Sequence, residues 1–203
     1  REYDLQDRIE TRLSDGLQSL EQGEADGMIC AGMGGPLMEK ILTEGRSRAR
    51  EFRELILQPQ SEIPAFRFFL QNEGYLLLDE NIVCEEGKYY FMMKVRWLGE
   101  TSETAVCGKV RESWNGTSEL AKQYGPILLA RRNPVLREYL ERMLEDRRQI
   151  AEHMQMKADT DNPKTRKRRQ EMTEEIFRLS QALEWYDNEK GQGEENDHSE
   201  NKR

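Results

Sequence analysis

Short apolar runs alternate with polar stretches along the first half of the chain. Residues 27–31 are continuously small or apolar, which is typical of a parallel strand buried on both faces. Residues 54–57, which are apolar after Glu54, predict another strand. Residues 9–13 alternate apolar and polar positions, so they predict a shorter strand. Helical spacing separates these runs and predicts a brief helix at 17–22 and a longer one at 36–42.

After residue 74 the spacing of apolar residues changes from helical to strand-like. Residues 63–72 have helical spacing and end before Gly74, a natural helix stop. The strand-like runs 75–84 and 89–97 then flank a polar, glycine-containing turn and predict a β-hairpin. The resulting order β-α-β-α-β-α-β-β indicates an α/β fold with parallel strands and an antiparallel pair at one edge.

The second half of the chain has a helical pattern. Residues 121–130 predict short helices, and Asn133 can cap a long helix with Pro134 in its first turn. A second long helix follows the break at 161–163. Apolar residues recur every third or fourth position in both, so we expect an antiparallel helical hairpin.

These patterns divide the chain into four parts. We expect an α/β domain over 1–98, a linker over 99–116, a helical coiled-coil domain over 117–187 and a disordered acidic tail over 188–203. The chain opens at Arg1 within what we expect to be continuous structure, so we also expect further segments upstream.

Charge changes this picture in one place. The 203 residues carry a formal net charge of −8, which argues weakly against a nucleic-acid partner. Residues 131–169, however, contain twelve Lys or Arg against seven Asp or Glu. A local basic surface can dock a polyanion whatever the net charge, so RNA remains a candidate partner.

Cysteine, histidine and hydropathy exclude several classes of protein. The three cysteines are widely spaced and odd in number, which indicates reduced thiols in a cytoplasmic protein. The two histidines have no cysteine or histidine at metal-ligand spacing, so no metal is expected. No apolar run approaches transmembrane length, so no membrane contact is expected. The sequence leaves the oligomeric state open.

Three features fall where the strands of an open α/β sheet end and ligands bind. The strongest is the segment 31–35, where three glycines within four residues let a ligand approach the backbone. A tight turn needs only one glycine, so the cluster favours a binding site. Its spacing fits neither the dinucleotide-binding fingerprint nor a P-loop.

The other two features are weaker. Asp15, followed by Gly16, can accept hydrogen bonds from an amine or a ribose hydroxyl, or simply cap the next helix. Gln58, followed by Pro59, can read a base edge with its amide, or simply begin a loop. Both alternatives stay open for each pair.

These residues resemble a known family. The motifs DGL at 15–17, AGMGG at 31–35 and LILQP at 55–59 are similar to those of the TrmK family, bacterial tRNA (adenine(22)-N1)-methyltransferases. The resemblance runs from about Gln6 to Trp97 and continues more loosely beyond. It implies a class I, Rossmann-like methyltransferase sheet followed by a C-terminal helical coiled-coil domain, with S-adenosyl-L-methionine as cofactor and tRNA as partner.

The resemblance also implies roles for individual residues. Asp15 and Gly16 are expected near the cofactor adenine, and Gln58 and Pro59 on the base-facing side. Gly35 is expected to be structural. The residues expected to contact cofactor or base are Ala31, Gly32, Met33 and Gly34. A basic surface facing tRNA is expected from Lys164, Arg166, Lys167, Arg168 and Arg169, although helix-surface ion pairs also explain many of the arginines.

The sequence departs from the family in one respect. The family's first two strands, which carry its glycine-rich cofactor loop, are missing, and they would lie between the strands expected at 9–13 and 27–31. We therefore expect this chain alone to be inactive, and its catalytic residues stay unassigned. The alternatives are a non-catalytic RNA- or protein-binding module with a coiled-coil arm, or a similar methyltransferase acting on a small molecule or a protein.

Overall fold

The computed structural model describes residue 5 and residues 7–98, 119–156 and 162–187. The chain divides into two compact units, Arg1–Ile127 (the sheet unit) and Leu128–Arg203 (the hairpin unit). The linker predicted over 99–116 and the tail predicted over 188–203 lie outside the described residues.

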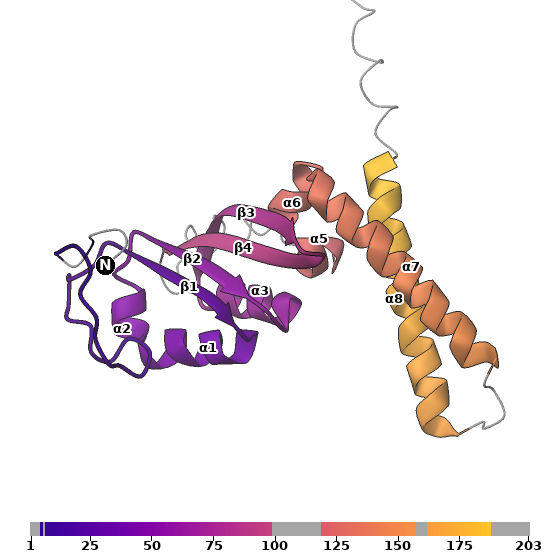
Figure 1. The fold of residues 1–203 in the computed structure, drawn as a ribbon, viewed down its shortest axis with the longest axis horizontal. Coiled ribbons are helices and arrows are strands. Elements are labelled where there is room, and N and C mark those ends of the chain that lie inside the picture. The colour runs from indigo at the N-terminus through magenta and orange to yellow at the C-terminus, as the bar shows by residue number, and fades with distance from the viewer. Residues whose placement is uncertain (1–4, 6, 99–118, 157–161, 188–203) are drawn as a thin grey trace, which may run out of the picture. The chain divides into compact units, whose positions relative to one another are not determined.

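The sheet unit is built on four strands, β1 (Gly27–Met33), β2 (Glu54–Pro59), β3 (Tyr75–Glu85) and β4 (Lys88–Trp97). Their spatial order is β1-β2-β4-β3 (Figure 1). β1 and β2 are parallel, and β4 is antiparallel to both β2 and β3. The predicted α/β fold, with an antiparallel pair at one edge, is therefore confirmed.

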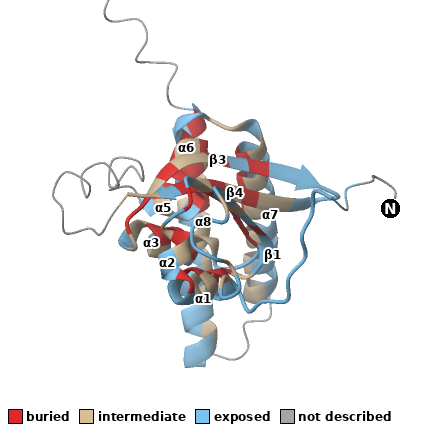
Figure 2. Ribbon diagram, turned by 90° about the vertical axis from the view of Figure 1, so that its left-hand side faces the viewer, coloured by how far each residue is buried: buried red, intermediate tan, exposed pale blue. Residues whose placement is uncertain are grey.

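Three helices pack on one face of this sheet, α1 (Gly35–Glu44), α2 (Arg46–Ala49) and α3 (Ile63–Asn72) (Figure 1). Between the layers, Met38 and Phe66 from the helices and Leu55 and Met93 from the strands are fully buried. Figure 2 shows such buried stretches on both helices and strands. Each of these side chains contributes about 1.5–3 kcal/mol by leaving water, so the core holds the layers together.

β1 forms one edge of the described sheet, and one of its faces is open. Its side chains alternate, so Cys30 is buried toward the helices whereas Ile29 is 75% exposed on the other face. The strand predicted at 27–31 is confirmed. Its predicted burial on both faces is not found within the described ranges.

The strand predicted at 9–13 and the helix predicted at 17–22 are wrong. Neither segment has regular secondary structure, and Leu13 is 100% exposed. Alternation alone does not make a strand, because the backbone groups of a strand need a neighbouring edge to bond with. The segment is held instead by side chains, chiefly by the ion pair between Arg12 and Glu24.

The hairpin unit contains the two long helices predicted from the sequence, α7 (Pro134–Met156) and α8 (Pro163–Asp187). Asn133 caps α7 as expected, since its Oδ1 accepts a hydrogen bond from the N–H of Val135 at 2.9 Å. Asn162 caps α8 in the same way through the N–H of Thr165, also at 2.9 Å. Local capping chemistry therefore sets both helix starts.

The two long helices pack antiparallel, as predicted. Tyr186 near the end of α8 donates a hydrogen bond to the carbonyl of Asn133 before α7, at 3.2 Å. Midway along the pair, Arg147 Nε lies 2.8 Å from Glu175 Oε1. The apolar residues Leu136, Leu140 and Leu179 are buried along the contact.

A buried ion pair ties the sheet to the helices that follow it. Arg67 on α3 and Glu80 on β3 have side chains that are 2% and 0% exposed, and Arg67 Nε lies 3.0 Å from Glu80 Oε1. Arg67 Nη1 donates to the carbonyl of Gln123 at 2.9 Å, in α5 (Glu119–Tyr124). Glu80 Oε2 accepts from the N–H of Ile127 at 2.9 Å, at the start of α6 (Pro126–Ala130).

The break between these short helices requires glycine. Gly125 has φ +103°, and a Cβ there would lie 2.7 Å from Glu80 Oε1. The ion pair and the break therefore form one tightly packed junction.

Replacing Glu80 by Ala should destabilise the sheet unit by about 3–5 kcal/mol, because it leaves a buried guanidinium without its carboxylate. Chemical denaturation followed by circular dichroism measures the change. The matched control is Glu119→Ala on α5, whose ion pair with Lys122 is exposed and contributes less than about 1 kcal/mol. Equal midpoints for the two variants would contradict the role given to the buried pair.

Candidate functional site

The glycine cluster lies at the carboxyl end of β1, beside the carboxyl end of β2. Strand pairing joins Ala31 to Gln58 and Met33 to Pro59, so Gly32 is a bulged residue between the two pairs. Gly32 has φ +79°, a conformation that glycine adopts without strain. The predicted ligand-facing bend is therefore a β-bulge at the edge where parallel sheets bind ligands.

Two backbone hydrogen bonds join the end of β1 and the start of α1 to the loop after β2. The N–H of Gln60 donates to the carbonyl of Met33 at 2.8 Å, and the N–H of Gly35 donates to the carbonyl of Ser61 at 3.1 Å. A Cβ on Gly35 would lie 2.8 Å from the same Ser61 oxygen. Gly35 is thus required for close approach of the two loops, the structural role expected of it.

Gly32 differs because the space beside it is open. Of the described atoms, only Gln60 Nε2, at 3.9 Å, would come within 4 Å of a Cβ on Gly32. Ala31 and Met33 on either side are exposed. A ligand can therefore reach the backbone of residues 31–33 without displacing a side chain.

The structure places Gln58 against this bulge. Its side chain is largely buried, its Oε1 accepts a hydrogen bond from the N–H of Gly32 at 2.8 Å, and its Nε2 lies 3.3 Å from the carbonyl of Pro59. Both ends of the amide therefore have partners within the protein. A direct contact between Gln58 and a base stays a prediction.

Two acidic side chains, Glu39 on α1 and Glu62 before α3, interact electrostatically. Burial, and then repulsion from Glu62, raise the pKa of the Glu39 carboxyl above its usual range. Glu62 itself precedes α3 with φ +53°, an uncommon conformation for a residue other than glycine.

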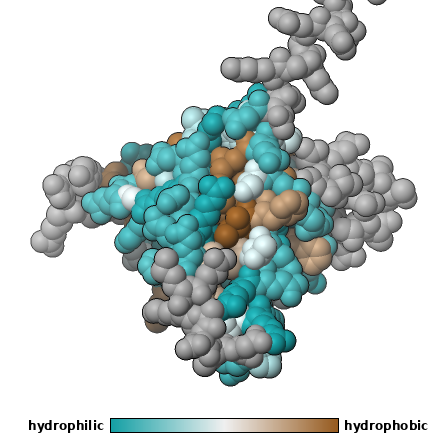
Figure 3. Space-filling view, turned by 90° about the vertical axis from the view of Figure 1, so that its right-hand side faces the viewer, coloured by the Kyte–Doolittle hydropathy of each residue, from teal (hydrophilic) through white to brown (hydrophobic). Residues whose placement is uncertain are grey.

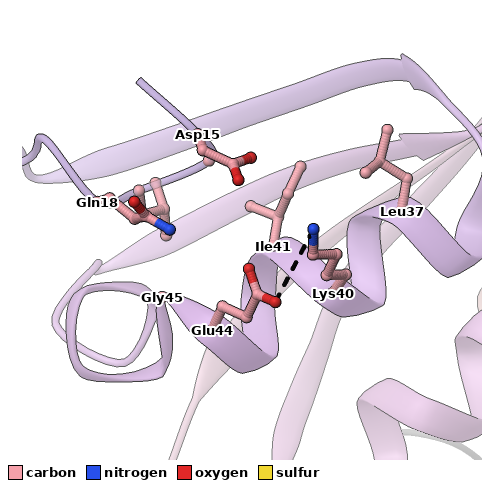
Figure 4. A pocket seen from close by; sticks show the side chains of 9 residues that line it. Asp15, Gln18, Leu37, Lys40, Ile41, Glu44 and Gly45 are labelled. Atoms are coloured by element: carbon pink, nitrogen blue, oxygen red, sulfur yellow. Dashed lines mark ion pairs between the residues drawn. The ribbon is translucent and has the colours of Figure 1, made fainter. Parts of the chain in front are cut away.

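Asp15 and Gly16 lie over the second half of α1 rather than beside the glycine bulge (Figure 4). They line a small pocket with Leu37, Lys40, Ile41, Glu44 and Gly45 of the helix region. A Cβ on Gly16 would touch Ile41 at 3.4 Å. The structure thus brings the predicted cofactor residues together in two groups, one at each end of α1.

The five basic residues predicted to face tRNA do not all lie on one surface of α8. Lys164, Lys167 and Arg168 line an open hollow on α8 together with Glu171, Met172 and Glu175. Arg169 instead reaches the carbonyl of Met154 on α7 at 3.3 Å, and Arg166 is exposed outside that hollow. Figure 3 views the molecule from the side of α7 and α8 and shows mostly hydrophilic atoms around a narrow hydrophobic seam.

Sequence analysis missed three residues that lie beside the predicted site residues. Gln60 and Ser61 follow β2 and Ile41 lies on α1, and none of them belongs to a motif. Only the strand order could have indicated Gln60 and Ser61, because loops that follow adjacent parallel strands meet at the same edge of a sheet.

Among the described residues, no group of three or more His, Cys, Asp or Glu side chains could hold a metal ion. No helix of the described part of the chain is long and apolar enough to cross a bilayer.

Known proteins share this fold and these motifs. The tRNA (adenine(22)-N(1))-methyltransferase of Bacillus subtilis (strain 168) is 33% identical over 161 residues, which cover 79% of this chain and 63% of that protein. The matched part thus spans less than two thirds of that relative.

Solved structures of related proteins have a similar fold. The crystal structure of the B. subtilis M1A22 tRNA methyltransferase TrmK superimposes with a TM-score of 0.67 and 28% identity, over 85% of this chain and 69% of that one. Streptococcus pneumoniae Sp1610 in complex with S-adenosyl-L-methionine gives a TM-score of 0.64 and 25% identity, over 90% and 72%. The four strands and their helices therefore have the Rossmann-like fold that the resemblance implied.

A sequence model of one family covers most of the chain. It is that of TrmK, tRNA (adenine(22)-N(1))-methyltransferase, and it matches residues 1–181. Since this match takes in both the glycine bulge and the helical hairpin, the chain belongs to the TrmK family.

Proposed function

We propose that this chain takes part in S-adenosyl-L-methionine-dependent methylation of adenine N1 at position 22 of tRNA, in the cytoplasm. The observation that carries the proposal is the open glycine bulge at the carboxyl ends of two parallel strands. Family membership supports the reaction, and the complex of Sp1610 supports the cofactor.

The residues present fit such a cofactor in two respects. Ala31, Gly32 and Gly34 offer backbone without bulky side chains on either side of the exposed Met33, while Asp15 and Gly16 offer a carboxylate and a turn at the other end of α1. Ile41 lies six residues beyond Gly35, about 9 Å along the helix axis. An extended ligand with adenosine at one end and methionine at the other can contact both groups.

In this methyl transfer, the main task of the protein is to position the cofactor and the adenine. The cofactor supplies a methyl group on a sulfonium, which adenine N1 takes with its own lone pair, so that S-adenosylhomocysteine leaves and positive charge develops on the ring. The bulge and the loop around Ser61 would hold the base in line. The carboxylates of Glu39 and Glu62 have the sign that stabilises the charge formed.

The open edge of β1 indicates that the described strands are only part of the binding site. Within the described residues, Ile29 is exposed on the uncovered face and β1 pairs on one side only. Backbone groups along such an edge bond readily with a further strand. We infer that cofactor affinity depends on strands that pair with this edge.

Calorimetry with S-adenosyl-L-methionine tests this inference. We expect no measurable binding to the 203-residue chain, and binding to a fusion in which the upstream segment of the B. subtilis relative precedes residue 1. Absence of binding to a folded fusion would refute the cofactor proposal. Equal binding to both proteins would show that the described strands suffice.

Methyl transfer to tRNA transcripts tests the substrate. The fusion should methylate a transcript with adenine at position 22 and leave unmodified a transcript in which that adenine is replaced by guanine. Detection of 1-methyladenosine by mass spectrometry of digested tRNA gives the readout. Cofactor binding without transfer to either transcript would favour a different methyl acceptor or a binding module.

The helical hairpin offers a surface for the tRNA. Lys164 shares one face of α8 with Lys167 and Arg168 because these follow it by three and four residues. Lys167 is 3.8 Å from Glu171 in an exposed pair that water screens, so its charge stays available. Phosphate contacts from such a face add affinity independent of base sequence.

Reversing these three charges to Glu in the fusion should weaken tRNA binding and lower the slope of log affinity against log salt by about two to three. Filter binding at several salt concentrations measures both quantities. The matched control reverses three exposed basic residues of the sheet unit, Arg53, Lys88 and Arg96, and changes the net charge equally. Equal losses in the two variants would mean that net charge, and not the α8 face, controls binding.

A further inference from the structure

The bulge at Gly32 leaves a gap in the hydrogen-bond ladder between β1 and β2. Ala31 pairs with Gln58 and Met33 pairs with Pro59, whereas Gly32 has no strand partner. Proline has no N–H, so β2 has no backbone donor to offer at Pro59. The parallel pair would therefore loosen at the point where the ligand-facing loop begins.

The side chain of Gln58 fills this gap. Its Oε1 accepts the N–H of Gly32 at 2.8 Å and so replaces a missing backbone carbonyl. Its Nε2 lies 3.3 Å from the carbonyl of Pro59, so one amide serves both strands. Only 9% of the residue is exposed, and water therefore competes weakly for these bonds.

The orientation of the amide follows from its partners. The N–H of Gly32 requires an acceptor and the carbonyl of Pro59 requires a donor, so a flipped amide would oppose like groups at both ends. A buried hydrogen bond with one defined orientation fixes geometry better than an exposed one. The bulge is thereby held in a single conformation with its open side outward.

We propose that Gln58 is a positioning residue, which holds the Gly32 bulge in its ligand-facing conformation through the Oε1 bond. This role differs from the direct contact with a base that the sequence predicted. Its consequence for catalysis rests on the proposed methyltransferase function. The bond itself does not, so the two can be tested separately.

Amide hydrogen exchange of the full 203-residue chain, measured by NMR, tests the bond. Gln58→Met keeps the length and volume of the side chain but removes the acceptor, so the protection factor of the Gly32 amide should fall by about tenfold. Gln60→Met is the matched control, because the bond from its backbone N–H to Met33 does not depend on its side chain. Gly32 protection within twofold of the wild type in Gln58→Met would overturn the proposal.

A second variant separates the bond from general loss of packing. In Gln58→Glu, the carboxyl keeps an acceptor for the Gly32 N–H whether it is ionised or protonated, and in the protonated form it also supplies a donor for Pro59. Gly32 protection should therefore be retained in Gln58→Glu, most fully at acidic pH, and stay low in Gln58→Met. Low protection in both variants across the pH range would also overturn the proposal.

Cofactor binding to the fusion with the upstream segment then tests the consequence. Gln58→Met should weaken binding of S-adenosyl-L-methionine at least about tenfold, while Gln149→Met, at an exposed position on α7, should leave it unchanged. Unchanged cofactor affinity in Gln58→Met would overturn the positioning role. If exchange confirms the bond but the unmodified fusion binds no cofactor, the bond stands and the methyltransferase function falls.

Discussion

The buried ion pair between Arg67 and Glu80 is the interaction on which the arrangement of the sheet unit most depends. Moving two charges out of water costs several kcal/mol for each ion, which the hydrogen bonds of both groups must offset. Arg67 Nη2 is buried without a hydrogen-bond partner among the described residues, so the bonds made by the other atoms of the pair matter more. Here those bonds go to different elements, from Arg67 to the carbonyl of Gln123 and from the N–H of Ile127 to Glu80. The helix α3, the strand β3 and the break between α5 and α6 are therefore fixed by one set of contacts.

Where local chemistry decides the structure, the sequence was sufficient to predict it. The helix at 63–72 and the cap at Asn133 depend on near neighbours, and both were predicted correctly. The strand at 54–57 was also predicted correctly, and it has strand neighbours on both sides, β1 and β4. The strand predicted at 9–13 failed because alternation describes only a strand's own faces, while its existence depends on an edge to pair with. The Arg67–Glu80 pair could not be predicted either, since a charged residue in a helix or a strand is ordinarily solvated.

The candidate site could likewise be predicted only where it depends on local sequence. The glycine cluster could be recognised as a bend after a buried strand, and it lies where parallel sheets bind ligands. Its contact with a cofactor stays a prediction. The sequence could not distinguish Gly35, which lets two loops approach, from Gly32, whose surroundings are open. Nor could it show that Gln58 bonds to a residue 26 positions earlier, because that contact arises only when the two strands pair in register.

The carboxyl groups of Glu39 and Glu62 bear on the proposed methyl transfer. Glu39 and Glu62 lie close enough to repel each other, and with burial this raises the pKa of the Glu39 carboxyl. A cation bound nearby would relieve that repulsion and lower the pKa again. The proposed reaction brings a sulfonium to this edge and leaves positive charge on the adenine ring as the sulfonium becomes neutral. Because the positive charge moves but does not disappear, a fixed carboxylate would accelerate methyl transfer only if it lay nearer to the adenine ring than to the sulfonium.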